Sequence, residues 1–174
     1  MGEATAARRR DSARVLVCDA QWRVLLFEAL DLYDGKPPLW ITPGGGLEPG
    51  EDPATAAARE LFEETGLELT PATLGAPIAV SGGRWTFRGE LMESVDSFFL
   101  TCTDALEVSQ HGWTDLERRM MRTWRWWTAD ELAATDERVA PGGLATLLAR
   151  LASGWRPDAG PVELPWRHLA EPFG

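Results

Sequence analysis

Three glutamates between residues 60 and 64 are the side chains best suited to chemistry. Glu60, Glu63 and Glu64 are related by three and four residues, so a helix would bring them together within about one turn. Carboxylates this close repel one another, and a hard divalent cation such as Mg2+, which prefers oxygen ligands, would neutralise them. Taken alone, the same pattern would equally describe a solvated helix face.

A glycine-rich run just before these glutamates makes the metal interpretation the better one. Pro43 is followed by Gly44, Gly45 and Gly46, and glycines permit backbone shapes that other residues resist. Backbone groups of such a loop can approach a phosphate closely or offer a carbonyl oxygen to a cation. We therefore predict metal and phosphate chemistry between the loop and the glutamates.

The glutamates should lie on a helix that begins at Pro53. Asp52 is a good N-cap, proline suits the first helical position, and the alanines that follow are strong helix formers. Gly66 is the expected end of the helix. A stripe that can pack on a sheet is formed by Ala54, Ala58, Leu61 and Thr65, with Ala57 and Phe62 at its edges.

Alternating and branched stretches on both sides predict the sheet that must position this loop and helix. Residues 12–18 and 22–29 suggest a hairpin joined by a short turn. Further strands are expected at residues 39–42, 76–81, 84–88, 95–103 and 123–128. A capping-box pattern, Thr128 with Glu131, opens a short helix, and another helix is expected at 142–153. One mixed α/β domain follows.

Length and composition are typical of a single globular domain, with 174 residues of which 44% are hydrophobic and 25% charged. We expect a flexible, basic N-terminal arm at residues 1–11, the folded domain at 12–156 and an irregular tail at 157–174. No apolar segment follows the basic start, so a secretory signal is not expected. Cys18 and Cys102 are interpreted as small core residues rather than a disulfide or a metal pair.

The formal net charge of −10 excludes some classes of partner. Duplex nucleic acid and anionic membranes would be repelled, and no apolar stretch approaches the roughly 20 residues needed to cross a bilayer. We therefore expect a cytoplasmic protein with neither as its partner. A small anionic substrate stays compatible with this charge, because a bound divalent cation can reverse the local field.

The run from Gly45 to Leu67 resembles the complete signature of the Nudix hydrolases. Gly45 is followed after five residues by Glu51, and after seven more by Arg59-Glu60-Leu61-Phe62-Glu63-Glu64-Thr65-Gly66-Leu67. All seven positions of fixed identity and both apolar positions are satisfied. Residues 126–132 also resemble a segment common near the end of that domain. The resemblance implies an α/β/α sandwich in which a mixed sheet is packed between helices.

The resemblance also implies an activity and a set of roles. Family members hydrolyse a nucleoside diphosphate linked to another group and require Mg2+ or Mn2+. The resemblance also suggests that this protein is a homodimer. The implied metal ligands are Glu60, Glu63, Glu64 and the backbone carbonyl of Gly44. Arg59 is implied to serve catalysis by pairing with the carboxylates and orienting them, while Glu51 would hold the loop and Gly66 is a structural position of the signature. Gly45 and Gly46 would approach the substrate.

The general base that takes a proton from the attacking water is open between two candidates. Glu60 lies inside the signature. Glu117 lies in residues 114–121, where family members often carry an extra functional acid, although a surface acid explains it equally well. Arg84 and Trp85, in a hairpin-like region after the signature, are candidates for substrate contacts.

The sequence leaves the substrate open. Family members that act on ADP-ribose often carry a proline shortly after the signature, where this chain has Gly82 and Gly83. Those acting on dinucleoside polyphosphates tend to have a tyrosine there, and the only tyrosine of this chain is Tyr33. A non-nucleoside diphosphate is a further possibility within enzymes. The alternative to an enzyme is a domain of the same fold that only senses or binds a ligand, but such domains usually lose a signature carboxylate.

Overall fold

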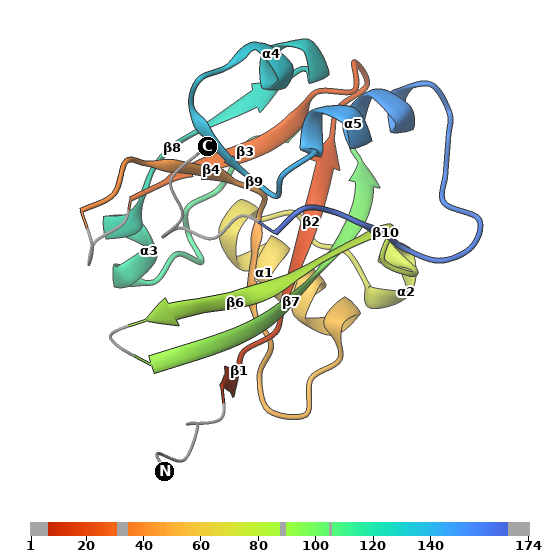
Figure 1. The fold of residues 1–174 in the computed structure, drawn as a ribbon. Helices are drawn as coiled ribbons and strands as arrows, with labels where there is room; N and C mark the ends of the chain where they lie inside the picture. Colours follow the sequence, from red (N-terminus) through yellow and green to blue (C-terminus); the bar gives the residue numbers. More distant parts are fainter. Residues whose placement is uncertain (1–6, 31–34, 88–89, 105, 167–174) are drawn as a thin grey trace.

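A mixed β-sheet forms the middle layer of the molecule (Figure 1). The computed structural model describes residues 7–30, 35–87, 90–104 and 106–166 of the chain. The path through the sheet is β10-β6-β7-β2-β3-β4-β9, while β1, β5 and β8 pair with β7, β2 and β3. The strands are β1 Arg8–Arg9, β2 Ser12–Cys18, β3 Val24–Ala29, β4 Leu39–Ile41, β5 Gly44–Gly46, β6 Ala79–Phe87, β7 Glu90–Cys102, β8 Met121–Trp127, β9 Arg138–Ala140 and β10 Val162–Glu163.

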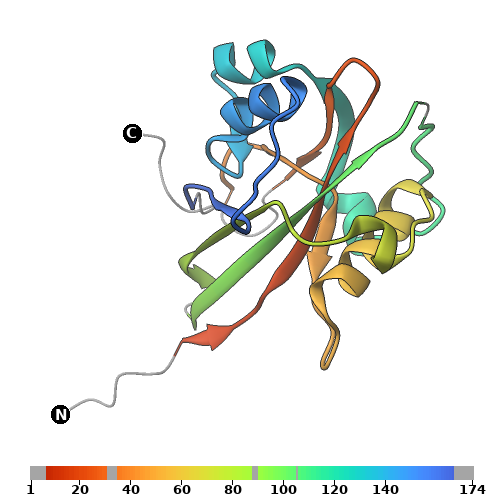
Figure 2. The same ribbon diagram turned by 90° about the vertical axis from the view of Figure 1, so that its right-hand side faces the viewer.

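Helices cover both faces of this sheet. They are α1 Pro53–Thr65, α2 Pro71–Leu74, α3 Asp115–Met120, α4 Ala129–Ala134 and α5 Leu144–Ala152. Side chains of a strand point alternately to its two faces, so Val15 and Val17 of β2 pack with α1 and α2, whereas Leu16 and Cys18 pack with α4 and α5. Figure 2 shows the two helical layers on opposite sides of the strands. The expected α/β/α sandwich is confirmed.

The hairpin that the sequence predicts for the first two long strands is present but short. Within the described residues, β2 and β3 pair at Cys18 and Val24 alone, and β3 goes on to pair with β4 and β8. β2 pairs in parallel with β7 along its whole length, and its start pairs antiparallel with β5. The strand β5 thus occupies the edge of β2 that a longer hairpin would need, and it brings the glycine loop into the sheet.

The two strands predicted at residues 76–81 and 84–88 are one strand, β6, which pairs with β7 from Ala79 to Phe87. Residue 88 lies outside the described part of the chain. Gly82 and Gly83 do not break the strand. A Cβ at Gly83 would collide with the ring of Trp166, so this glycine permits a close approach rather than a turn.

The folded part of the chain extends beyond both expected boundaries. Arg8–Arg9 pair in parallel with β7, and the carboxylate of Asp11 accepts a 3.1 Å hydrogen bond from the amide of Val95, so the expected arm contributes a strand. Near the other end, β10 pairs with β6 and Leu164 is buried in the core. Residues 1–6 and 167–174 lie outside the described part.

Two expectations about burial are corrected. Phe62, expected at the edge of the packed stripe, is 53% exposed, whereas Ala56 is buried. The helix packs on the sheet through Ala57 and Leu61, and Phe62 is turned away because it lies one residue beyond Leu61. Cys18 is buried but Cys102, at the end of β7, is exposed, and both are free thiols. Among the described residues no helix is long and apolar enough to cross a membrane.

Candidate metal centre

The helix α1 begins and ends at the residues that the sequence predicts. The carboxylate of Asp52 accepts hydrogen bonds from the amides of Ala54 and Thr55, at 3.0 and 3.2 Å. At the other end Gly66 adopts a left-handed conformation with φ 77° and donates its amide to the carbonyl of Phe62. These ends set the register of the helix and direct two of its glutamates towards the glycine loop.

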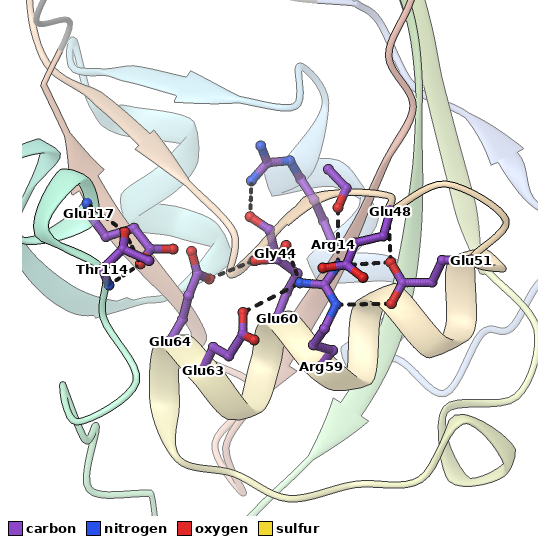
Figure 3. A network of polar contacts seen from close by, with 11 residues as sticks. Arg14, Gly44, Glu48, Glu51, Arg59, Glu60, Glu63, Glu64, Thr114 and Glu117 are labelled. Carbon is purple, nitrogen blue, oxygen red and sulfur yellow. Dashed lines mark hydrogen bonds and ion pairs between the residues drawn. The ribbon is translucent and has the colours of Figure 1, made fainter.

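Three carboxylates meet beside this helix, and they are not the three that the signature alone suggests. Glu60, Glu64 and Glu117 each offer one oxygen, and these oxygens lie within 4.8 Å of one another. Glu60 and Glu64 are buried and Glu117 is half-buried. Figure 3 shows the three side chains, with Glu60 and Glu64 on α1 and Glu117 on a separate segment. The side chain of Glu63, in contrast, is 43% exposed and contacts Arg59 at 3.4 Å. The structure therefore brings Glu117 into the cluster and leaves Glu63 at its rim.

Burial makes the negative charge of this cluster costly. Desolvation raises the pKa of Glu64 to about 8, against the opposing hydrogen bond from Gly44. Desolvation also raises the pKa of Glu60, although Arg59 opposes the shift. Buried carboxylates with raised pKa values favour either a proton or a cation. Three clustered carboxylate oxygens are the hard ligands that Mg2+ or Mn2+ would accept, so the residues present fit a divalent cation.

Arg59 holds the two halves of the signature together. Its Nε and Nη2 donate to the two oxygens of Glu51 at 2.9 and 2.8 Å, and its Nη1 donates to Glu60 at 2.8 Å. Nη2 also donates to the carbonyl of Gly46 at 3.2 Å. The arginine lowers the pKa of Glu51, and the carboxylates in turn raise the pKa of Arg59. A single guanidinium thus fixes the loop and one carboxylate of the cluster.

The glycine loop contacts the cluster through its backbone. The amide of Gly44 donates to Glu64 at 2.7 Å, while its carbonyl accepts from Nη1 of Arg14 at 3.4 Å. A Cβ at Gly45 would lie 2.6 Å from the carboxylate of Glu60. Only glycine at this position lets that carboxylate lie against the loop backbone.

Glu117 lies on a separate element, the short helix α3. The amide and the hydroxyl of Thr114 donate to Oε2 of Glu117 at 2.6 and 2.7 Å, and the amide of Glu117 donates back to Thr114. This reciprocal capping box fixes the glutamate side chain. The Thr-x-x-Glu pattern is visible in the sequence, and it could have indicated that Glu117 is held rather than free on a surface.

Sequence reasoning missed Arg14 and Trp113. Arg14 donates to the carbonyls of Thr42 and Gly44 and so supports the glycine loop. The indole of Trp113 donates to the carbonyl of Glu64 at 2.8 Å. Neither residue belongs to a signature, and both contacts join segments far apart in the chain.

The two predicted substrate residues on β6 are not part of the carboxylate cluster. Arg84 is exposed and forms an ion pair with Glu93 of β7 at 3.4 Å. Trp85 lies on β6, and its side chain is outside the described part. A hollow of about 600 Å3 borders the loop between β5 and α1 instead, and it is lined by residues 8–11 and 47–51. Arg10 lies beside Gly46 there.

A sequence model described as the NUDIX domain matches residues 8–148 of this chain. Curated relatives match over shorter stretches. The RNA pyrophosphohydrolase of Rhizobium meliloti is 53% identical over 45 residues, 26% of this chain and 27% of that protein. The RNA pyrophosphohydrolase of Agrobacterium fabrum is 46% identical over 63 residues, 34% of this chain and 37% of that protein. The matches thus span about a quarter to a third of the relatives' length.

Solved structures resemble the chain over most of its length. The match to the MutT protein of Methanosarcina mazei Go1 covers 87% of this chain and 98% of that chain, with a TM-score of 0.58 and 16% identity. A MutT NUDIX hydrolase of Burkholderia pseudomallei covers 81% and 98%, with a TM-score of 0.59 and 18% identity. An Ap4A hydrolase of C. elegans covers 83% and 96%, with a TM-score of 0.52 and 19% identity. At these identities the likeness is one of fold.

Proposed function

The chain belongs to the Nudix hydrolase family, whose domain model matches residues 8–148, and we propose that it cleaves the diphosphate linkage of a nucleoside diphosphate joined to another group. The observation that carries the proposal is the meeting of Glu60, Glu64 and Glu117, with oxygens within 4.8 Å. These residues come from two helices distant in sequence, and a bound cation would offset their mutual repulsion.

In this proposal Glu60, Glu64 and Glu117 would hold Mg2+ or Mn2+, and Glu63 and the carbonyl of Gly44 would be further ligands. A bound divalent cation would neutralise the diphosphate oxygens and make a coordinated water a better nucleophile. Arg59 keeps Glu60 directed at the cluster through its 2.8 Å hydrogen bond and anchors the loop through Glu51.

A carboxylate of the same cluster accepts the proton of the attacking water. Thr114 binds Oε2 of Glu117, and among the described residues the other oxygen, Oε1, accepts no hydrogen bond. Glu60 is the second candidate, because burial raises its pKa and a base works best when its pKa approaches the working pH. Substitution of each residue separately assigns the role.

The hollow beside the glycine loop is the proposed place for further anionic groups of the substrate. Arg8, Arg9 and Arg10 line it together with residues 47–51. Arg8 and Arg9 form exposed ion pairs with Glu90 and Asp11, and such pairs exchange partners at little cost. The guanidinium of Arg10 lies beside the loop, where a Cβ at Gly46 would be 3.5 Å from its Nε. Arginine is well suited to phosphate oxygens.

The experiment that tests the proposal is a substrate panel with purified protein and Mg2+. The panel holds nucleoside triphosphates, nucleotide sugars, ADP-ribose, dinucleoside polyphosphates, prenyl diphosphates and a 5′-triphosphorylated oligoribonucleotide, the last because the curated relatives are RNA pyrophosphohydrolases. Cleavage of one class by the wild type but not by Glu60→Gln supports the proposal. If no compound is cleaved with either cation and one raises the melting temperature, the ligand-sensing alternative replaces it.

The proposal also includes a homodimer and a cytoplasmic location, both of which rest on the family resemblance and the sequence. Light scattering coupled to gel filtration measures the oligomeric state directly. A monomer at micromolar concentration would remove the dimer from the proposal without affecting the proposed hydrolysis.

A further inference from the structure

The helix that carries Glu117 buries none of its own side chains, and Arg118 binds the carbonyl of Gln110 in the segment before it at 2.9 Å. Its six residues are too few to form a stable helix without outside support. Glu117 nevertheless reaches the buried pair Glu60 and Glu64. Two neighbouring segments therefore place α3: β8, which follows it at Met121 and pairs with β3, and residues 109–114, which come just before it.

This segment lies against the final turn of α1 and satisfies its free carbonyls. The last carbonyls of a helix have no partner within the helix. The amide of Ser109 donates to the carbonyl of Thr65 at 2.9 Å, and the indole of Trp113 donates to the carbonyl of Glu64 at 2.8 Å. Between them, Gly112 approaches so closely that a Cβ there would collide with the backbone of Glu63.

Trp113 anchors this segment in the core of the protein. Its side chain is only 7% exposed and packs edge-on against Phe27 and Trp124, with ring centroids 5.7 and 6.4 Å away. The next residue, Thr114, binds the carboxylate of Glu117. A continuous path thus runs from the backbone of Glu64 through Trp113 and Thr114 to Glu117.

We propose that Trp113 is a positioning residue that sets the spacing between Glu117 and the pair Glu60 and Glu64. Its indole N–H fixes the segment to the same residue, Glu64, whose side chain belongs to the cluster. This inference rests on the proposed metal site and adds to it a residue outside the signature. Loss of the indole donor lets α3 shift away, so that the cluster binds a divalent cation with two carboxylates in place of three.

The test measures Mn2+ binding to the protein without substrate, by electron paramagnetic resonance titration of free Mn2+. Trp113→Phe keeps a packing ring but removes the donor, and we expect the Kd for Mn2+ to rise about tenfold. Trp124→Phe is the matched control, because it removes an indole from the same aromatic cluster and leaves the bond to Glu64 in place. Its Kd should stay within about twofold of the wild type.

A double-mutant cycle shows whether Trp113 acts through Glu117. In the Glu117→Gln background, Trp113→Phe should change the Kd by less than about twofold, because the ligand that it positions is already lost. An equal loss in both backgrounds would overturn the positioning role, as would equal Kd values for Trp113→Phe and Trp124→Phe. If Trp113→Phe does not fold, as judged by circular dichroism, Gly112→Ala displaces the same segment and enters the same cycle.

The proposed metal site and the proposed role of Trp113 predict different results in this experiment. A wild-type protein that binds no Mn2+ would contradict the metal site on which the proposed function stands. A wild type that binds Mn2+, and a Trp113→Phe variant that binds it equally well, would contradict the role of Trp113 alone.

Discussion

The amide of Gly44 donates a 2.7 Å hydrogen bond to the carboxylate of Glu64, across twenty residues of sequence. This bond joins the glycine loop to the helix at the side of the helix that carries the cluster. One oxygen of this buried carboxylate, Oε2, is thereby held by the backbone. The same carboxylate also sets the expected pH dependence of the metal-free protein.

Without metal, the protein should lose stability as the pH rises. Burial raises the folded-state pKa of Glu64 from 4.5 to about 8 and that of Glu60 in the same direction, so the folded state holds these protons more tightly than the unfolded chain. The contribution of Glu64 to stability is complete below about pH 4.5 and is lost as the pH rises through about 8, and Glu60 acts in the same direction. Melting temperatures in EDTA across this interval measure the effect.

Two controls accompany the pH series. Glu64→Gln should flatten the decline, while Glu63→Gln, at the exposed rim of the cluster, should retain it. Mg2+ at a hundredfold excess over its Kd should raise the wild-type melting temperature by about 5 to 10 °C at the upper end of the range. A decline that is unchanged in Glu64→Gln would contradict the assignment.

Glu117→Gln should lower kcat by a factor of about 100 or more if Glu117 is the base, with a smaller loss if it only binds metal. Glu131→Gln is a matched control because Thr128 and Glu131 form the same capping box on α4, away from the cluster. Both variants weaken a helix cap, so their melting temperatures should fall by similar amounts. Equal kcat values for the two would exclude a catalytic role for Glu117 and leave Glu60 as the base.

Arg59→Lys should reduce activity about 10- to 100-fold, because a lysine cannot bind both oxygens of Glu51 and also reach Glu60. The loss should appear in kcat and in the Mg2+ concentration needed for activity. Arg23→Lys provides the comparison, since Arg23 binds Asp19 through two nitrogens outside the cluster. If both variants lose activity equally, the effect is one of general stability.

Gly45→Ala should lower kcat while changing the melting temperature little. A Cβ there would lie 2.6 Å from the carboxylate of Glu60, and the flexible end of that side chain would move aside at small cost. Gly82→Ala, whose Cβ would meet its nearest atom at 3.4 Å, is the control. Full activity of Gly45→Ala, measured at saturating Mg2+, would show that Glu60 tolerates displacement.

Local signals predicted the local structure of the site. Asp52, Pro53 and Gly66 define the helix because caps and helix breakers act within a few residues. The spacing of the signature likewise indicated that Arg59 pairs with neighbouring carboxylates. Each of these contacts depends on residues close in sequence or on one continuous helix.

The arrangement between segments could not be predicted in the same way. Helical spacing groups Glu63 with Glu60 and Glu64, but it does not say which of them faces a second helix that arrives fifty residues later in the chain, and the structure selects Glu117. Gly82 and Gly83 separate the two strands that the sequence predicts, but they lie inside the single strand β6. At Gly83 the glycine makes room for the ring of Trp166. Such outcomes follow from tertiary packing, which overrides local propensity.

The strand β10 has a consequence for any shortened form of this protein. It pairs with β6 at Val162 and Glu163, beyond the boundary at residue 156 that composition suggests. A fragment trimmed at that boundary would leave this stretch of β6 with unpaired amides and carbonyls at the border of the sheet. Exposed edges of this kind recruit strands from other molecules. The trimmed fragment is therefore expected to aggregate on concentration, even though every residue of the carboxylate cluster is still present.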